Sequence, residues 1–372
     1  MLHLFNKYTI HSTTFMILLG ILTEAIHLRK TNIFIFILAV IVFFVTFLFN
    51  FSEKPPQKHK KESKIEDSAP SGFKVPDKGL HTFIGASSDE VKKRFGKPEF
   101  IDPTAYGYDW WVYGRRSEQY LQIGVENGQV VTIYALGKNL PTGPFNIGEN
   151  AQKILQKIPL SETETLNYKG AKIELEFKED EWMIMPLVKF GHVWVQLYFD
   201  HFTNRLMSVR YLTNEVLVNQ KPYNMAIIKG HLEKNPEPSE EQWRAIEAGE
   251  TREIYEITNI LRMRNGIDAL NWNKGAGIAA FQHSQEMNNK DYFGHDSKWK
   301  GGVKDRLTAQ GVDGTAFGEN IAENYSDGIA AVIGWLNSEE HRKNMLDPAF
   351  TETGIGVYRQ EYTQDFVKYV GE

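Results

Sequence analysis

The longest hydrophobic segment of the chain lies near its start, where residues 32–51 read NIFIFILAVIVFFVTFLFNF without a charge. As an α-helix, these 20 residues would be about 30 Å long, which matches the hydrocarbon core of a bilayer. A soluble domain rarely buries a helix that is apolar on all sides. The pattern predicts a transmembrane helix over 32–51 within an anchor region over 1–51. No small-residue cleavage site follows, so we expect the anchor to be retained.

A shorter apolar run covers residues 15–28 and contains Glu24 and His27. It fits a second span, an interfacial helix or part of a long start, and the sequence does not choose among them. Residues 52–80 are rich in Pro, Lys, Glu and Ser and carry few large apolar side chains. Such a segment cannot bury enough apolar surface to fold alone, which predicts a flexible linker.

Residues 81–214 alternate between helical and strand patterns. Ser87 followed by Glu90 predicts a capped helix that ends at Gly96. YDWWVYG, YLQIGVE and QVVTIYALG then read as strands, and Asn127-Gly128 between the last two predicts a type I′ hairpin. FNIGENAQKILQKI and a later strand pair resemble this unit, so we expect a tandem-repeat α+β domain. Its aromatic residues fit the sheet core better than a contact surface: Trp110, Trp111, Tyr113 and Trp194.

Residues 215–250 read as a connection, in which Asn235-Pro236-Glu237-Pro238 stops any helix before Ser239 caps a new one. From 251 to 372 the pattern predicts helices over 251–265, 277–290 and 330–336. Two strands, TGIGVYRQ and QDFVKYVG, follow, and LNWN reads as a turn. Helices flanking a small sheet give an α+β sandwich. FGENIAENY reads as a Gly-Glu-Asn triplet just before an apolar helical pattern.

Composition removes several classes of function. The net charge of −5 offers no overall attraction to nucleic acid, so we expect no nucleic-acid partner. The absence of cysteine excludes disulfides, thiolate nucleophiles and cysteine-based zinc sites. No phosphate-binding loop, nucleophile elbow or His-Glu-x-x-His motif occurs.

Three residues of the C-terminal region carry candidate chemistry: His295, Glu319 and His341. Two imidazoles and a carboxylate can hold a divalent cation, or can act as a general-base pair. Equally, Glu319 and Asn320 can accept or donate backbone hydrogen bonds that hold their turn, and His341 can bond within the fold. The pattern leaves these interpretations open.

The motifs DYFGHDS, GENIAENY and GWLNSEEHRKNMLDPAFTETGIGVY, in this order, resemble the CAP superfamily of cysteine-rich secretory proteins, antigen 5 and pathogenesis-related protein 1. The resemblance covers about residues 251–366. FGKPEFIDPTAYGY and YGYDWWVYG resemble the N-terminal domain that accompanies CAP domains in Gram-positive bacteria of the Bacillus type.

The resemblance implies an α-β-α sandwich whose central cleft holds two histidines and two acids, with zinc or another divalent cation in some members. His295, Glu319 and His341 fall on three of these positions, with the histidines as metal ligands and Glu319 as ligand or catalytic base. Ser338 stands where many members carry the second acid, so Glu339 is the candidate substitute. CAP domains act outside the cytoplasm, which implies a single-pass anchor with residues 52 onward outside, although the lysines after the span favour the opposite orientation.

Two functions remain after this comparison. In the first, the extracytoplasmic CAP domain binds an envelope component, a lipid or a protein partner through a cleft lined by His295, Glu319, Asn320, Glu339 and His341. In the second, it is a metal-dependent, peptidase-like hydrolase. A third interpretation gives these residues only a role in supporting the fold. Whether the chain is an enzyme stays open.

Overall fold

The computed structural model of the chain describes residues 75–158 and 160–369. The predicted span over 32–51, the run over 15–28 and most of the predicted linker lie outside these residues. None of the helices formed within 75–158 and 160–369 combines the length and the apolar character needed to cross a bilayer.

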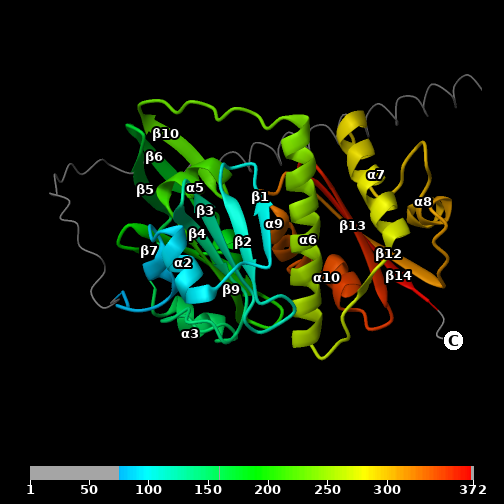
Figure 1. Cartoon of the computed structure of the whole chain (residues 1–372), viewed down its shortest axis with the longest axis horizontal. Helices are drawn as coiled ribbons and strands as arrows, with labels where there is room; N and C mark the ends of the chain where they lie inside the picture. The colour runs from blue at the N-terminus through cyan, green and yellow to red at the C-terminus, as the bar shows by residue number, and fades with distance from the viewer. Residues whose placement is uncertain (1–74, 159, 370–372) are drawn as a thin grey trace, which may run out of the picture. The chain divides into compact units, whose positions relative to one another are not determined.

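The first half of the described chain is organised around an antiparallel seven-stranded sheet (Figure 1). Asn127 and Gly128 both have positive φ, 50° and 78°, so the hairpin predicted between the third and fourth strands is confirmed. All four aromatic residues assigned to the sheet core are buried. In spatial order the strands are β1 (Phe100–Pro103), β2 (Asp109–Tyr113), β3 (Leu121–Glu126), β4 (Gln129–Ala135), β9 (Arg205–Leu212), β8 (Val193–Asp200) and β7 (Leu187–Phe190).

One face of this sheet is covered by short helices: η1 (Leu80–Phe83), α2 (Ser88–Phe95) and α3 (Ala151–Leu155). The predicted capping box of α2 is present, since Ser87 accepts a bond from the Glu90 amide and Glu90 accepts one from the Ser87 amide. Asn150 caps α3 in a related way. The residue two positions before each cap, Gly85 and Gly148, has positive φ and donates its amide to a sheet strand. This shared geometry is consistent with the tandem repeat, which stays a prediction.

The region predicted as a connection is folded. It contains α5 (Asn214–Gln220) and β10 (Asn224–Lys229), and β10 completes a three-stranded sheet with β6 (Ala171–Glu176) and β5 (Thr163–Tyr168). Helix α4 (Glu179–Ile184) links β6 to β7. We call residues 80–229 the sheet domain.

The predicted boundary between the connection and the C-terminal domain, at residues 250 and 251, was wrong. A single helix, α6 (Glu240–Arg264), runs through it. Ser239 and Gln242 form the expected capping box at its start. Gly249, which weakens a helix pattern, lies where β1 approaches: a Cβ atom there would be 2.9 Å from Cβ of Asp102. One side of α6 packs on the sheet domain, and the other packs on the rest of the chain (Figure 1).

Residues 240–368 form the C-terminal domain, which is built around a four-stranded sheet. Its spatial order is β11 (Asn271–Trp272), β13 (Glu352–Tyr358), β14 (Glu361–Lys368) and β12 (Ala316–Glu323). Helices α7 (Lys274–Lys290) and α8 (Val303–Ala309) contact one face. Helices α6, α9 (Gly328–Leu336) and α10 (Glu339–Leu346) contact the other. The result is a mixed α+β architecture with helices on both faces of the sheet.

Two sequence predictions for this domain were wrong. LNWN is not only a turn, because Asn271 and Trp272 form β11, parallel to β13. The apolar pattern after the Gly-Glu-Asn triplet does not start a helix, because the triplet and the residues after it belong to strand β12, which pairs with β14 over its whole length. Short apolar runs do not distinguish strand from helix by period, and pairing with β14 decides the outcome here.

Two glycines allow α7 to lie unusually close to the sheet. A Cβ atom on Gly354 would lie 2.0 Å from the amide nitrogen of Gly277, and one on Gly356 would lie 1.9 Å from that of Phe281. Only a residue without a side chain fits at these positions of β13. This close packing sets the distance between α7 and the sheet. It therefore also positions the loop after α7 relative to β12.

Candidate functional site

Four of the predicted site residues, His295, Glu319, Asn320 and His341, gather around β12, which is one of the two edge strands of the four-stranded sheet. Because side chains alternate along a strand, neighbouring residues point to opposite faces. Glu319 points toward α7 and α8, where it meets His295 and Arg306. Asn320 points toward α10, where its side-chain amide donates to the carbonyl of His341 at 3.0 Å. Because β12 lies at the edge of the sheet, the residues around Glu319 on one face and those around Asn320 on the other lie near the same edge.

Glu319 is the electrostatic centre of this group. Its Oε1 accepts a hydrogen bond from Nδ1 of His295 at 2.8 Å, and its Oε2 forms an ion pair with the guanidinium of Arg306. The side chains of Glu319 and Arg306 are each 2% exposed. Arg306 also donates to the carbonyl oxygens of His295 and Gly301, at 2.7 and 3.0 Å, and so holds the loop that carries His295.

The protonation states follow from these contacts. Burial raises the pKa of Glu319, but the hydrogen bond from His295 and the charge of Arg306 outweigh it, and the pKa lies below its usual range. The hydrogen bond to Glu319 raises the pKa of His295. Burial, with the charge of His295, lowers the pKa of His341. The site thus combines His295, whose cationic form is favoured, with His341, whose neutral form is favoured.

Ser338 and Glu339 behave differently from what the motif suggested. Ser338 Oγ lies 2.9 Å from Nδ1 of His341, so the serine at the expected position of the second acid contacts a site histidine. Glu339 begins α10 and is exposed, and within residues 75–158 and 160–369 its carboxylate makes no hydrogen bond or ion pair.

Three contributors were missed by the sequence analysis: Arg306, His283 and Asp365. His283 is buried on α7, with Nε2 4.0 Å from Oε2 of Glu319. Asp365 lies opposite Glu319 on β14 and is fully buried, and burial beside Glu319 raises its pKa well above the usual range. Asp365 sits in the strand EYTQDFVK among other polar residues, so its residue type gave no distinct signal. No spacing in the sequence points to Arg306.

The donor set allows a limited test of metal binding. His295 and His341 each use Nδ1 for a protein contact, which leaves both Nε2 atoms free to bind a cation. A carboxylate that is hydrogen-bonded to the other ring nitrogen of a ligating histidine, as Glu319 is to His295, is a common arrangement. Glu319 is unsuited as a third ligand because both of its oxygens are engaged. No group of three or more His, Cys, Asp or Glu side chains within the described residues is arranged to hold a metal ion. The residues fit at most two protein ligands, fewer than zinc sites typically use.

Comparison with known proteins identifies the two domains. The model for the CAP-associated N-terminal domain matches residues 84–223, and that for CAP, the cysteine-rich secretory protein family, matches residues 255–370. The chain is 42% identical over 318 residues to the uncharacterized membrane protein YlbC of Bacillus subtilis, covering 84% of this chain and 92% of that protein. The chain belongs to the CAP family. The predicted family and its accompanying N-terminal domain are confirmed.

Other relatives agree with this assignment. The uncharacterized protein YkwD of Bacillus subtilis is 35% identical over 118 residues, which are 31% of this chain and 46% of YkwD. A solved extracellular protein with an SCP domain from Bacillus anthracis is 38% identical, with a TM-score of 0.75 over 83% of this chain and 99% of its own. A cysteine-rich secretory protein from Staphylococcus aureus, 24% identical, shares the fold, with a TM-score of 0.71 over 79% of this chain and 94% of its own.

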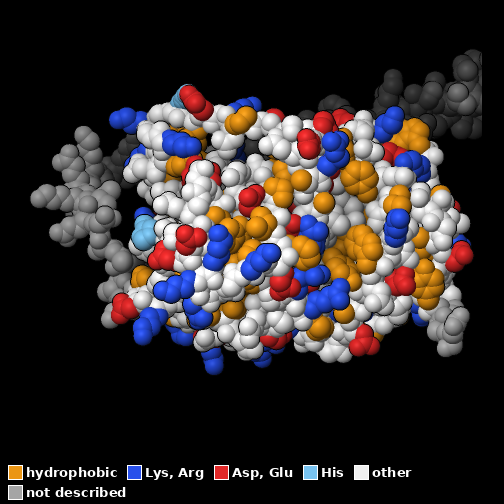
Figure 2. Space-filling view, viewed as in Figure 1, with side chains coloured by type: hydrophobic (Ala, Val, Ile, Leu, Met, Phe, Trp, Pro, Cys, Tyr) orange, Lys and Arg blue, Asp and Glu red, His pale blue; other side chains and the backbone are white. Residues whose placement is uncertain are grey.

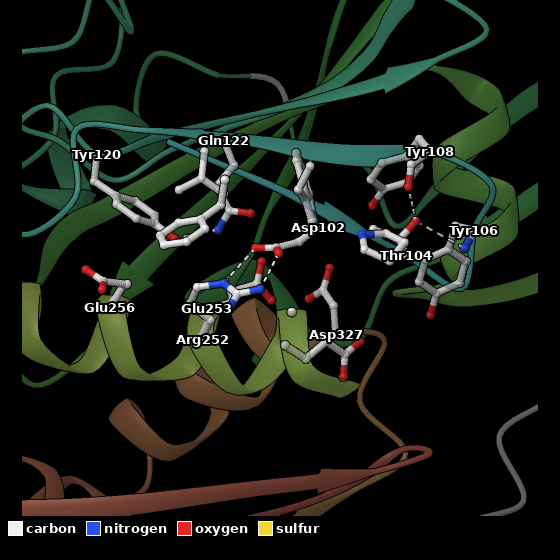
Figure 3. Close-up of a pocket in the computed structure, with 16 residues that line it drawn as sticks. Asp102, Thr104, Tyr106, Tyr108, Tyr120, Gln122, Arg252, Glu253, Glu256 and Asp327 are labelled. Carbon is white, nitrogen blue, oxygen red and sulfur yellow. Dashed lines mark hydrogen bonds and ion pairs between the residues drawn. The ribbon is translucent and has the colours of Figure 1, made fainter. Parts of the chain in front are cut away.

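A second polar cluster lies where the sheet domain meets α6 of the CAP domain. Figure 3 shows it between strands of the sheet and the helix, with Asp102 reaching down to Arg252 and Glu253 and Glu256 rising from α6. The cluster surrounds a cavity of about 20 Å³, room for roughly one water molecule. We call it the interdomain seam. Its acidic members are Asp102, Glu250, Glu253, Glu256 and Asp327.

Not all of these carboxylates are neutralised by a partner. Arg210 pairs with Asp327 at 2.7 Å, and Arg115 donates to Glu256 at 3.0 Å. Glu253 accepts only from the amide of Ile329 among the bonds formed by the described residues, and its other oxygen is buried without a partner. Burial and the nearby Asp327 raise the pKa of Glu253 well above its usual range. The seam therefore favours the protonated form of Glu253 over a wider pH range than an exposed carboxyl would show.

Proposed function

We propose that this CAP-family protein is a membrane-anchored, extracytoplasmic binding protein, whose CAP domain binds an anionic group of an envelope component at His295 and His341. The observation that carries the proposal is the engagement of both Glu319 oxygens, by His295 and by Arg306. This arrangement orients an imidazole that is 55% exposed and favours its cationic form.

The same observation weighs against the hydrolase alternative. A general base must be free to accept a proton and works best with a pKa near the ambient pH. Glu319 is buried, bonded through both oxygens and has a lowered pKa. A metal-dependent route would need an ion held by two imidazoles alone. An exposed His295 with a raised pKa, beside a His341 with a lowered pKa, suits recognition of a phosphate or carboxylate better than proton abstraction.

Three findings support an envelope ligand. The similar YlbC is named a membrane protein, the solved relative from Bacillus anthracis is named an extracellular protein, and residues 32–51 have the length and composition of an anchor. Figure 2 shows acidic and basic side chains interspersed on the face in view, without a large region of one sign. Recognition of a local anionic group requires no such region.

The test is cosedimentation of the detergent-solubilised full chain with two probes, Gram-positive cell-wall fragments and phosphatidylglycerol vesicles. We expect binding to at least one probe, weakened at least about tenfold in His295→Ala, because a charge-assisted hydrogen bond is lost. His231→Ala, which removes an exposed histidine outside the site, is the matched control. Binding should also weaken as the pH rises through the raised pKa of His295. Equal binding by His295→Ala and the wild-type chain would rule out the proposal.

A further inference from the structure

The structure holds a second, much larger cavity between the two domains, apart from the histidine site. Its volume is about 730 Å³, within the range of small-ligand pockets. The sheet domain contributes α4 with the residue after it, α5 with its C-terminal loop, and residues of β8 and β9, and the CAP domain contributes the loop over residues 324–326 and α9. Both domains are therefore needed to form it. We call it the interdomain cavity.

The interdomain cavity has an apolar wall and an amide-bearing wall. Ile184, Met185 and Ile333 contribute apolar surface, and the methionine side chain adapts to different shapes. Asn219 and Asn324 line the cavity, and within residues 75–158 and 160–369 neither side-chain amide makes a hydrogen bond. A carboxamide both donates and accepts, so a free one pairs naturally with a peptide group.

Arg210 supplies the most specific feature. It lines the interdomain cavity, its side chain is 1% exposed, and it pairs with Asp327 at 2.7 Å and donates to Tyr108 at 3.0 Å. Its Nε–H is buried without a partner among the described residues. A buried donor without an acceptor carries a free-energy penalty, which a ligand oxygen can relieve. Because Asp327 already neutralises the guanidinium, a neutral carbonyl suits this donor better than an anion.

Two of the three tyrosines that line the cavity are parts of its wall. Tyr198 is 2% exposed and its hydroxyl is bonded to Gln196, while Tyr106 donates to the carbonyl of Ser326 at 2.6 Å. The third, Tyr325, is 37% exposed, so a carbohydrate that stacks on this ring is the competing ligand that the test below includes. Apolar surface for side chains, free amides and an unpaired N–H together match an extended peptide.

We propose that the interdomain cavity binds a short peptide, whose backbone is recognised by Asn219, Asn324 and the Nε–H of Arg210 and whose apolar side chain packs against Ile184, Met185 and Ile333. This site is independent of the histidine group around β12. Peptide occupancy would join the sheet domain to the CAP domain, because residues of both contact the same ligand.

The test is isothermal titration of the full chain in detergent micelles with blocked tetrapeptides that combine Leu, Ala and Asn. Chitotriose serves as the carbohydrate probe. We expect saturable one-to-one binding of a leucine-containing tetrapeptide and none of chitotriose. Asn219→Ala should weaken peptide binding about tenfold through the loss of one or two hydrogen bonds. Ala330→Leu, which fills the cavity from α9, should weaken it at least as much.

The matched control is Asn288→Ala, on the exposed face of α7 and outside the cavity. It should bind peptide like the wild-type chain. Thermal unfolding of each variant separates loss of the site from loss of the fold, and His295→Ala should leave peptide binding unchanged. Absence of binding by every tetrapeptide, binding of chitotriose alone, or peptide binding equal in Asn219→Ala, Ala330→Leu and the wild-type chain would overturn the proposal.

Discussion

The histidine site and the interdomain seam both contain a buried carboxylate, Glu319 in the first and Glu253 in the second, but of these two only Glu319 has a partner on each oxygen within the described part of the chain. Around β12, the buried carboxylate of Glu319 has a partner on each oxygen and stays charged, and it directs an exposed imidazole outward. In the seam, Glu253 has a buried oxygen without a partner among the described residues, and burial raises its pKa. A buried carboxylate that has partners, such as Glu319, stays charged and orients the side chains bonded to it. A buried carboxylate without enough partners, such as Glu253, has a raised pKa, so the stability of the domain contact depends on pH.

The largest expected effect comes from breaking the paired part of the seam. Arg210→Met should lower the free energy of unfolding by about 3–5 kcal/mol, because it leaves the buried charge of Asp327 uncompensated. Urea denaturation of the full chain measures the change. Arg205→Met, at an exposed position of the same strand, is the control and should cost far less. A loss below about 1 kcal/mol would show that Asp327 is not held as a buried ion pair.

The next effect concerns the unpaired part of the seam. Glu253 has a raised native pKa, so above the usual carboxyl pKa the unfolded chain releases a proton that the native chain retains. Stability therefore falls as pH rises, by up to about 1.4 kcal/mol per pH unit for this group, until the native pKa is reached. Glu253→Gln, which mimics the protonated form, should gain stability relative to wild type as pH rises.

Denaturation curves from about pH 5 to about pH 8 test this dependence. Glu241→Gln, on the exposed start of the same helix, is the control and should follow the wild-type profile. A constant difference between Glu253→Gln and wild type across this range would show that Glu253 is ionised in the folded chain, and the contrast between the two sites would then disappear.

The histidine site should respond weakly in stability and strongly in binding. His295→Ala removes a half-exposed partner of Glu319, while Arg306 still neutralises the carboxylate, so we expect a loss of about 1 kcal/mol or less. Thermal unfolding together with the envelope-binding assay separates the two effects. A large loss of melting temperature without a change in binding would support the interpretation that the site only maintains the fold.

The smallest effect is expected for zinc. Two free Nε2 atoms without a carboxylate ligand should give weak one-to-one binding, which disappears in His341→Ala. Calorimetric titration of zinc into the chelator-treated full chain measures it. Tight binding would mean that Glu319 exchanges Arg306 for the metal, and the hydrolase alternative would then regain support.

Several elements were predictable from local sequence. Ser87 with Glu90, and Asn127 with Gly128, satisfy backbone requirements within a few residues, so the capped helix α2 and the hairpin were predicted correctly. The motif order around His295, Glu319 and His341 identified the family. Strand β12 was missed because its hydrogen bonds lead to β14, some 45 residues away along the chain, and its own short apolar run fits either period.

The sequence by itself determined the family, the local helix and turn signals, and the residue types of the histidine group. Only the tertiary structure decided that Arg306 engages Glu319, that α6 is continuous through Gly249, and that both domains share the seam and the larger cavity. The physical reason is distance along the chain. Capping and turn preferences are set by neighbouring residues, whereas the pairing and burial of a charge depend on residues that only folding brings together.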